Sequence, residues 1–326
     1  MNEIISVVMP CYNGEKTLQK TLDSVFAQSF REFKLYCIND GSTDGTAKIL
    51  AQYSLLNKNM LVIDKANQGQ TKAKNDALKV AKGKYIAFID SDDVWDNEKL
   101  LYQYACMEKE RDVGLCYTNG YYIDVDDHIH QKFEIEAKLQ GECLRELFMG
   151  NAIVASSVMI RSALLKKTGL FDENLSACEN WELWTRFASH SKLAVIDMPL
   201  TRYRRHDNNM SHNIDKMRRN RLYVLEKNAQ SYHNHFPNFN QLVKEAFYKA
   251  HQFFGENYLW KLQLPKARRD LMHALRYKPF EKKLYYLLFK SFLGEKLLSK
   301  VRNIVTAHES SGRRQASSNR SVHKST

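Results

Sequence analysis

Residues 61–93 read LVIDKANQGQTKAKNDALKVAKGKYIAFIDSDD, and this stretch decides the fold class. The apolar run at 61–63 predicts a short strand, and apolar residues at helical spacing predict a helix over 71–81. A second apolar run at 85–89 predicts another strand, which stops at the acidic segment 90–93. A strand, a helix and a strand in succession are typical of a βαβ unit in a mostly parallel sheet.

The same alternation continues toward the N-terminus. Residues 4–9 and 33–38 predict two further strands, and residues 15–29 and 46–53 predict the helices that follow them. In such sheets, ligands bind beyond the carboxyl ends of the strands. Polar residues follow three of these ends, at 10–15, 39–42 and 90–93. We therefore expect a binding site at this edge of the sheet.

The rest of the chain changes character along its length. Residues 113–127 predict a strand pair, residues 151–160 a further strand and residues 180–189 a helix. From residue 216 onward the patterns are helical, and the final residues show no packing pattern. The sequence therefore predicts an α/β domain at 1–215, a basic helical region at 216–305 and a disordered tail at 306–326.

Composition indicates a soluble globular protein. The chain has 326 residues, of which 44% are hydrophobic and 26% are charged. Neither a signal peptide nor an apolar run of about 20 residues is evident, so no membrane-spanning helix is expected. The six cysteines form no CxxC pair, which disfavours a zinc site and favours a reduced, cytoplasmic setting.

Charge is distributed unevenly. Residues 1–200 hold 23 Lys and Arg against 28 Asp and Glu, whereas residues 201–326 hold 26 against 9. The excess positive charge therefore lies entirely in the last third of the chain. Such a block indicates either a polyanionic partner, such as membrane lipid, nucleic acid or an anionic substrate, or a basic surface that only water contacts.

The acidic segment 90–93 has two interpretations. Asp90 and Asp92, one residue apart at a strand end, could hold a divalent cation together with substrate phosphates. Alternatively, Asp92 and Asp93 could simply cap the helix that begins near Asn97. An EF-hand is excluded because the sixth position from Asp90 is Trp95 rather than glycine. P-loop, dinucleotide-binding and serine hydrolase motifs are also absent from the sequence.

Six segments together resemble family 2 glycosyltransferases, the inverting enzymes of the GT-A fold. They are VVMPCYNGEKTLQKTLDSVFAQSF (7–30), LYCINDGSTDGT (35–46), NQGQTKAKNDALKVAKGKYIAFIDSDD (67–93), SSVMIRSALLKKTGLFDENL (156–175), CENWELWTRFAS (178–189) and YRRHDNNMS (203–211). They occur in family order and cover about two thirds of the chain. The resemblance implies a GT-A (Rossmann-like) α/β fold, here followed by a C-terminal all-helical region.

The resemblance also implies a donor site. It assigns the nucleotide-sugar to a set of residues comprising Pro10, Tyr12, Glu15, Asp40, Lys74, Asp90, Ser91, Asp92 and Arg204. Asp40 is expected to accept a hydrogen bond from the base, which favours uracil or thymine. Asp92 and His206 are expected to meet Mn²⁺ or Mg²⁺ and the diphosphate. This arrangement would neutralise the charge that develops on a nucleoside diphosphate leaving group.

Two positions depart from the family pattern. Where the family usually has Glu-Asp, this chain has Glu179-Asn180, and an asparagine cannot take a proton from an acceptor hydroxyl. The catalytic base is therefore predicted to be Glu179, or Glu182 one turn later, although Glu179 could instead only orient the acceptor. Lys74 stands where arginine is commoner, and lysine lacks the bidentate fork that suits a phosphate.

The predicted function is transfer of a sugar, with inversion, from a nucleoside-diphosphate sugar to a hydroxyl of a glycan or lipid-linked acceptor. UDP is the favoured nucleotide, and cell-surface polysaccharide synthesis the favoured setting. One alternative is a sugar nucleotidyltransferase, which would release pyrophosphate. The other is a non-enzymatic nucleic-acid-binding protein that uses the basic C-terminal segment, but no recognised motif supports it and nucleic acid is a disfavoured partner.

The C-terminal segment 281–326 is expected to contact an anionic membrane surface. Its basic residues surround leucines and other apolar residues at helical spacing, as in an interfacial helix. This predicts a cytoplasmic protein that binds peripherally to the inner face of the cell membrane. Alternatively, the apolar stripe packs on the protein itself.

Overall fold

The computed structural model describes residues 3–133, 139–207 and 209–294. The chain divides into two compact units, Met1–Ser231 and Tyr232–Thr326, which are described separately below. The predicted boundary at residue 215 falls at the start of helix α8 (Ile214–Ser231), the last helix of the first unit. The predicted tail at 306–326 lies outside the described residues.

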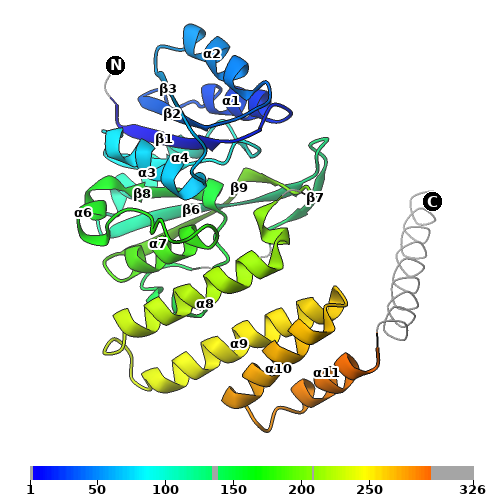
Figure 1. Ribbon diagram of the computed structural model, residues 1–326. Coiled ribbons are helices and arrows are strands. Elements are labelled where there is room, and N and C mark those ends of the chain that lie inside the picture. Colours follow the sequence, from blue (N-terminus) through cyan, green and yellow to red (C-terminus); the bar gives the residue numbers. More distant parts are fainter. Residues whose placement is uncertain (1–2, 134–138, 208, 295–326) are drawn as a thin grey trace, which may run out of the picture. The chain divides into compact units, whose positions relative to one another are not determined.

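The first half of the sheet is parallel, as the sequence predicts (Figure 1). Its four strands run in the order β3-β2-β1-β4, and each is parallel to its neighbours. They are β1 (Ile5–Cys11), β2 (Phe33–Asp40), β3 (Met60–Lys65) and β4 (Tyr85–Phe88). Every residue of β1 and β4 is buried, which is why both strands read as continuous apolar runs.

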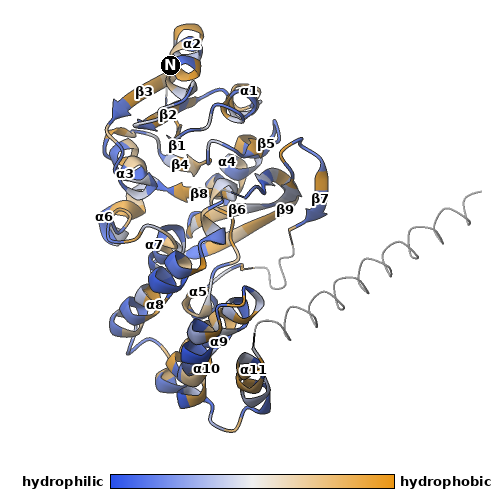
Figure 2. Cartoon of the chain, turned by 45° about the vertical axis from the view of Figure 1, so that its right-hand side comes forward, coloured by the Kyte–Doolittle hydropathy of each residue, from blue (hydrophilic) through white to orange (hydrophobic). Residues whose placement is uncertain are grey.

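The second half of the sheet is mixed. Strand β8 (Val158–Arg161) pairs antiparallel with both β4 and β6 (Val113–Ile123), and β6 runs parallel to β9 (Lys192–Arg204). Short strands β5 (Val94–Trp95) and β7 (Ile129–Lys132) complete the sheet. In Figure 2 the hydrophobic colour is prominent on the inner strands β6 and β8.

The strand expected over 151–160 is shorter than the sequence suggests. Residues Ala155–Ser157 form a 3-10 turn before β8 begins. Ser156 Oγ accepts the N–H of Asp90 at 3.0 Å and donates to the carboxylate of Asp93. The turn therefore braces the acidic segment.

Helices cover both faces of the sheet. Ile5, Val7 and Met9 of β1 share one apolar core with helices α1 (Leu18–Phe26), α2 (Thr46–Leu56) and α4 (Lys99–Lys109). On the other face lie α3 (Gln70–Val80) and α7 (Glu179–Ala188). There the ring of Phe88 in β4 lies 5.6 Å from Phe171 and 5.5 Å from Trp184. The remaining short helices are α5 (Leu144–Met149) and α6 (Leu165–Thr168).

The second unit is helical over its described residues. It comprises α9 (Phe239–Trp260), α10 (Leu264–Tyr277) and α11 (Lys282–Phe292). A Cβ on Gly255 of α9 would lie 2.7 Å from a methyl carbon of Leu271, so glycine permits a close crossing of α9 and α10. No helix among the described residues is long and apolar enough to cross a bilayer.

Candidate functional site

A cleft of about 990 Å³ opens at the carboxyl ends of β1, β2 and β4. This is the edge at which the polar segments of the sequence were expected to meet. Its lining includes eight of the predicted site residues: Pro10, Tyr12, Asp40, Asp90, Ser91, Asp92, Glu179 and His206. Lys74, Glu15, Glu182 and Arg204 are not part of the lining. The cleft is large enough for a small-molecule substrate.

Asp92 and His206 meet in the cleft. Nε2 of His206 lies 2.8 Å from Oδ2 of Asp92, and this hydrogen bond raises the pKa of His206. Both side chains are about a quarter exposed. An aspartate oxygen and an imidazole nitrogen are ligands that suit Mn²⁺, and carboxylates suit Mg²⁺. The donor set therefore fits a divalent cation.

Lys74 lies between two carboxylates of the cleft, those of Glu179 and Asp90. Its Nζ lies 3.0 Å from Oε1 of Glu179 and 3.9 Å from Oδ1 of Asp90, and its side chain is 1% exposed. Burial alone would lower the pKa of Lys74, but the charges of Glu179 and Asp90 outweigh it and raise the pKa. Burial raises the pKa of Asp90, against the opposing effect of Lys74. Lys74 thus serves as a counter-charge to the carboxylates.

Glu179 is held at the start of α7 by three donors. Its Oε1 accepts hydrogen bonds from Nε2 of Gln70 at 2.8 Å, from Nζ of Lys74 and from Nδ2 of Asn180 at 3.0 Å. Asn180 also accepts from Lys74 through Oδ1 at 3.1 Å. Asn180 therefore orients the carboxylate beside it.

Glu182 is engaged elsewhere. Its two carboxylate oxygens contact Arg186 at 2.9 and 2.6 Å, and Lys227 of α8 lies 2.8 Å from Oε1. Its side chain is 1% exposed, as is that of Glu179, so the two differ in their contacts and not in their burial. The geometry makes Glu182 a structural link between α7 and α8, whereas Glu179 faces the cleft.

Arg204 and Arg205 have different surroundings: Arg204 binds backbone oxygens in the interior, and Arg205 lines the cleft. Arg204 is fully buried and donates to the backbone oxygen of Asp92 at 2.8 Å and of Asp124 at 2.7 Å. Arg205 lines the cleft, with its guanidinium carbon 3.5 Å from the ring centroid of Tyr122. Sequence reasoning missed Arg205. The alternation of side chains along a strand could have shown that only one of the two arginines faces the cleft.

Asp40 and Glu15 both hold loops. The two carboxylate oxygens of Asp40 accept the N–H groups of Gln68 at 2.9 Å and Gly69 at 2.7 Å, and Asp40 still lines the cleft. The carboxylate of Glu15 accepts the N–H of Gly45 at 3.0 Å. Glu15 is not part of the cleft lining, and its carboxylate instead binds the loop before α2.

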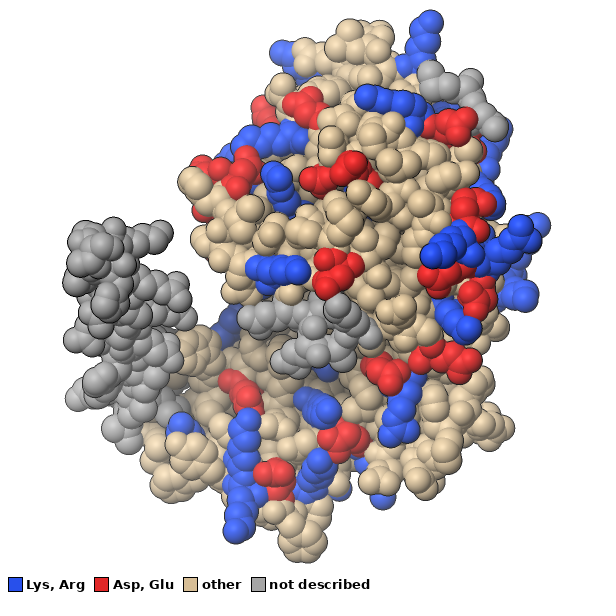
Figure 3. Space-filling view, turned by 180° about the vertical axis from the view of Figure 1, so that it is seen from behind, with Lys and Arg blue, Asp and Glu red and all other residues tan. Residues whose placement is uncertain are grey.

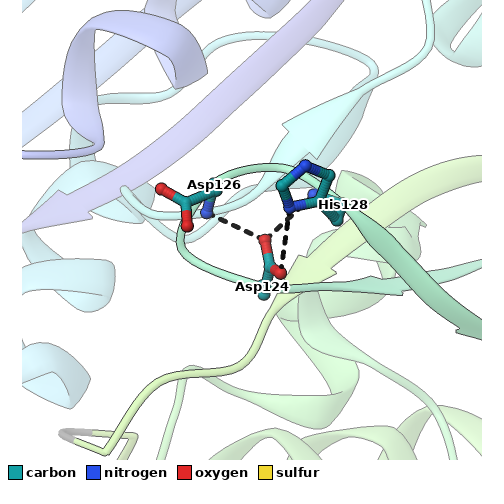
Figure 4. Close-up of side chains that lie close together, drawn as sticks. All are labelled: Asp124, Asp126 and His128. Carbon is teal, nitrogen blue, oxygen red and sulfur yellow. Dashed lines mark hydrogen bonds and ion pairs between the residues drawn. The ribbon is translucent and has the colours of Figure 1, made fainter.

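A second acidic cluster lies in the turn between β6 and β7 (Figure 4). Oδ1 of Asp124 accepts the N–H groups of Asp126 at 2.8 Å and His128 at 2.9 Å. Nδ1 of His128 lies 3.2 Å from Oδ2 of the same aspartate. These bonds are those of an aspartate that caps a tight turn. They account for the cluster without a metal ion.

Cationic side chains also line the cleft. Lys216 and Arg221 of α8 belong to the lining, with Arg205 from the end of β9. The guanidinium carbon of Arg221 lies 5.7 Å from the ring centroid of Trp181 on α7. Sequence reasoning did not single out Lys216, although its place in the basic C-terminal third was a signal.

Sequence comparisons place the chain among glycosyltransferases. The model described as glycosyl transferase family 2 matches residues 6–167. An uncharacterized glycosyltransferase of Methanocaldococcus jannaschii is 31% identical over 251 residues, which cover 75% of this chain and 86% of that protein. This chain belongs to glycosyl transferase family 2.

Two bacterial relatives of this family 2 glycosyltransferase have more specific names. The UDP-Glc:alpha-D-GlcNAc-diphosphoundecaprenol beta-1,3-glucosyltransferase of Escherichia coli is 30% identical, over 65% of this chain and 81% of that enzyme. A Bacillus subtilis glycosyltransferase named for teichuronic acid biosynthesis is 38% identical over 38% of this chain and 49% of that protein. The family 2 enzyme is thus related to enzymes of cell-surface polysaccharide synthesis.

Solved structures share the fold. A crystal structure of S. aureus TarS matches with a TM-score of 0.65 and 21% identity, over 89% of this chain and 88% of that chain. The mannosyltransferase PcManGT of Pyrobaculum calidifontis, in complex with GDP-Man and Mn²⁺, matches with a TM-score of 0.60 and 14% identity, over 93% and 88%. The family 2 glycosyltransferase therefore has the predicted GT-A fold, with a helical C-terminal region.

Proposed function

We propose that this glycosyltransferase transfers a sugar from a UDP-sugar, with inversion, to a hydroxyl of a lipid-linked glycan acceptor during cell-surface polysaccharide synthesis. The observation that carries this proposal is one cleft whose lining includes both Asp90, Asp92 and His206 and the carboxylate of Glu179. A donor held at the first group would present its anomeric carbon toward the second. The lipid-diphosphate acceptor named for the E. coli relative supports the acceptor class.

Asp92 and His206 would hold Mn²⁺ or Mg²⁺, and Asp90 and Ser91 would contact the ribose and sugar. Such a cation supplies neutralisation of the charge that develops on the departing diphosphate. Asp40 is assigned to the N–H of uracil, because each carboxylate oxygen can accept a second hydrogen bond beside the loop amide that it already binds. Tyr12, which is 53% exposed, would border the base together with Pro10.

Glu179 is assigned as the base. All three of its donors contact Oε1, so Oε2 is the oxygen that would take the proton of the acceptor hydroxyl. The hydroxyl oxygen then bonds to the anomeric carbon as the bond to the diphosphate oxygen breaks, and the bonding electrons leave with the nucleoside diphosphate. Attack from the face opposite the leaving group inverts the anomeric configuration.

Lys216, Arg221 and Arg205 support an acceptor that carries phosphate. They add cations to a cleft whose carboxylates would otherwise repel an anionic acceptor. Arginine and lysine are the usual phosphate-binding side chains. Lys216→Ala is expected to raise the KM for a diphosphate-linked acceptor and to leave the KM for the UDP-sugar unchanged, in steady-state assays with each substrate varied.

The donor is tested by thermal unfolding with a panel of UDP-, GDP- and TDP-sugars in the presence of Mn²⁺. A ligand at about 100 times its Kd adds about 2.7 kcal/mol to the free energy of unfolding, so the true donor should raise the Tm more than the other nucleotide sugars.

An assay of the released product separates this function from that of a nucleotidyltransferase. Free UDP supports glycosyl transfer, whereas pyrophosphate would identify a nucleotidyltransferase.

The base is tested with Glu179→Gln. General base assistance is typically worth about 10²–10⁴-fold in rate, so kcat should fall by that factor while calorimetry gives an unchanged Kd for UDP. An unchanged kcat would show that Glu179 is not the catalytic base.

Asp92→Ala should abolish the metal dependence of donor binding. A wild-type affinity for the donor with Mn²⁺ in this variant would contradict the assignment of Asp92 to the metal.

The face seen in Figure 3 bears on the nucleic-acid alternative. Lys and Arg alternate there with Asp and Glu rather than forming a continuous basic surface. A nucleic-acid site requires basic side chains clustered on one face. On the described part of this face, the charge pattern gives that alternative no support.

A further inference from the structure

Helix α11 uses its leucine side inside the second unit. Leu284 is fully buried and Leu287 is 8% exposed, and both belong to a cluster with Tyr248 of α9 and with Leu271 and Ala274 of α10. These leucines belong to the apolar stripe for which the sequence predicts either a lipid contact or packing on the protein itself. For them the structure supports the alternative, because they pack against the protein itself.

The opposite side of α11 is aromatic and exposed. Four large rings lie there, Tyr285, Tyr286, Phe289 and Phe292, with exposures of 55, 56, 63 and 67%. Their spacing of one, three and three residues places them on one arc of the helix, away from Leu284 and Leu287. Phe280, just before the helix, is 93% exposed. Contiguous exposed apolar surface of this kind marks a binding surface in soluble proteins.

The charges on α11 itself are basic. The helix contains Lys282, Lys283 and Lys290 and no acidic residue, and the acidic Glu281 caps its start by accepting the N–H of Lys283. Nζ of Lys290 lies 4.5 Å from the ring centroid of Tyr286, and the guanidinium carbon of Arg268 on α10 lies 4.8 Å from that of Phe292. Lys283 pairs with Glu256 of α9 at 2.7 Å, whereas Lys282 and Lys290 are the other two lysines of α11.

We infer that the outer face of α11 docks on the surface of an anionic lipid bilayer. Aromatic rings favour the boundary between headgroups and acyl chains, and lysines bind the negative lipid surface. With 11 residues, the helix is about 16 Å long and would lie in the plane of the membrane rather than cross it. The inference stands on α11 alone and does not depend on the proposed acceptor.

A lipid surface fits this face better than a second copy of the chain. In a symmetric pair joined through α11, the lysines of one copy would face the lysines of the other. Like charges brought together in a contact oppose association. An anionic bilayer instead complements both the rings and the lysines.

The test is flotation of the full chain with vesicles of phosphatidylcholine alone or mixed with phosphatidylglycerol. The wild type should float with the mixed vesicles. A variant with Tyr285→Ser, Tyr286→Ser, Phe289→Ser and Phe292→Ser should bind at least about tenfold more weakly, because its apolar contact is gone. The double variant Lys282→Glu with Lys290→Glu should lose binding to the mixed vesicles, and its binding to vesicles of phosphatidylcholine alone should equal that of the wild type. Wild-type flotation of the serine variant would overturn the inference.

The matched control is Leu55→Ser with Leu56→Ser on α2, which removes two apolar side chains that are 85 and 82% exposed. This control should float like the wild type, and its loss of binding would also count against the assignment to α11. A Phe289→Trp variant gives a gain of signal that needs no loss of fold. Its added fluorescence should be quenched by brominated lipids, and an unquenched signal on bound protein would refute the contact.

Two other occupants give distinct outcomes. If residues 295–326 carry the binding, deleting them abolishes flotation while the serine variant still floats. If a second copy covers the face, light scattering shows a dimer that the serine substitutions dissociate, and the wild type does not float. Either result overturns the inference. UDP binding by calorimetry, measured in parallel, tests the proposed function separately.

Discussion

At the scale of single residues, Lys74 has a role that its sequence context did not suggest. As a variant of a commoner arginine it suggested a phosphate contact, yet its ammonium lies against Glu179 and Asn180. The sequence could identify Lys74 as part of the site because it lies in a family motif. It could not identify the partner, because Glu179 is 105 residues away. Only the packing of α3 against α7 brings them together.

Lys74→Met should lower the free energy of unfolding by about 3–5 kcal/mol, because it leaves a buried carboxylate without its counter-charge. The double variant Lys74→Met with Glu179→Met should be less destabilised than the single one, since two apolar side chains then replace the pair. Urea unfolding measures both.

Lys79→Met on the same helix is the control for Lys74. Its ion pair with Asp76 is at the surface, where the side chain of Lys79 is 55% exposed, so the change should be within about 1 kcal/mol. The cycle also needs the single variant Glu179→Met. If the loss of unfolding free energy in the double variant equalled the sum of the losses in the two single variants, Lys74 and Glu179 would not act as a pair.

Lys99 should make stability depend on pH. Burial lowers its pKa to about 7, whereas a lysine in an unfolded chain has a pKa of about 10.4. Between these values the unfolded chain binds a proton that the folded chain does not. The free energy of unfolding contributed by Lys99 therefore rises with pH, by at most about 1.4 kcal/mol per unit, from pH 7 to 10.

Lys99→Met should flatten this dependence and stabilise the protein at pH 7. The measurement is urea unfolding at pH 7 and pH 9, with Lys109→Met, an exposed lysine on the same helix, as the control. Identical slopes in the wild type and Lys99→Met would contradict the prediction.

At the scale of elements, the sequence predicted the strands and helices best where burial is one-sided or complete. β1 and β4 read as continuous apolar runs because both faces are covered, and α7 showed its stripe through Trp181 and Trp184. The sequence could not choose between Glu179 and Glu182, since three residues place both near one side of a helix. The contacts that α3 and α8 make with α7 are what favours Glu179 in the proposed mechanism.

Glu182→Gln should separate stability from chemistry. It removes the carboxylate that Arg186 and Lys227 share, so the free energy of unfolding should fall by about 2 kcal/mol, discounted for the partial exposure of Lys227. The kcat should stay within about twofold of the wild type at a temperature where the variant is folded. A loss as large as that of Glu179→Gln would transfer the role of base to Glu182.

At the scale of the whole molecule, every described residue that lines the cleft belongs to the first unit. A chain of residues 1–231 is therefore expected to fold and to bind UDP with Mn²⁺ as tightly as the full chain, by calorimetry. Binding that is lost in a folded 1–231 chain would show that the second unit contributes to the donor site. The sequence placed its boundary at 215 because the patterns are only helical from residue 216 onward, and α8 continues for 16 residues beyond that boundary within the first unit.

The carboxylate of Asp40 accepts the amide N–H groups of Gln68 and Gly69, and it is also proposed to accept the N–H of the uracil nucleobase. A further hydrogen bond donated to that carboxylate would draw electron density from its oxygens and so weaken the hydrogen bonds of both amides. Their nitrogen and proton resonances should therefore move together when uridine nucleotides are added, and stay put with nucleotides that carry no matching imino hydrogen. Two backbone signals would thus act as a built-in reporter of nucleobase identity.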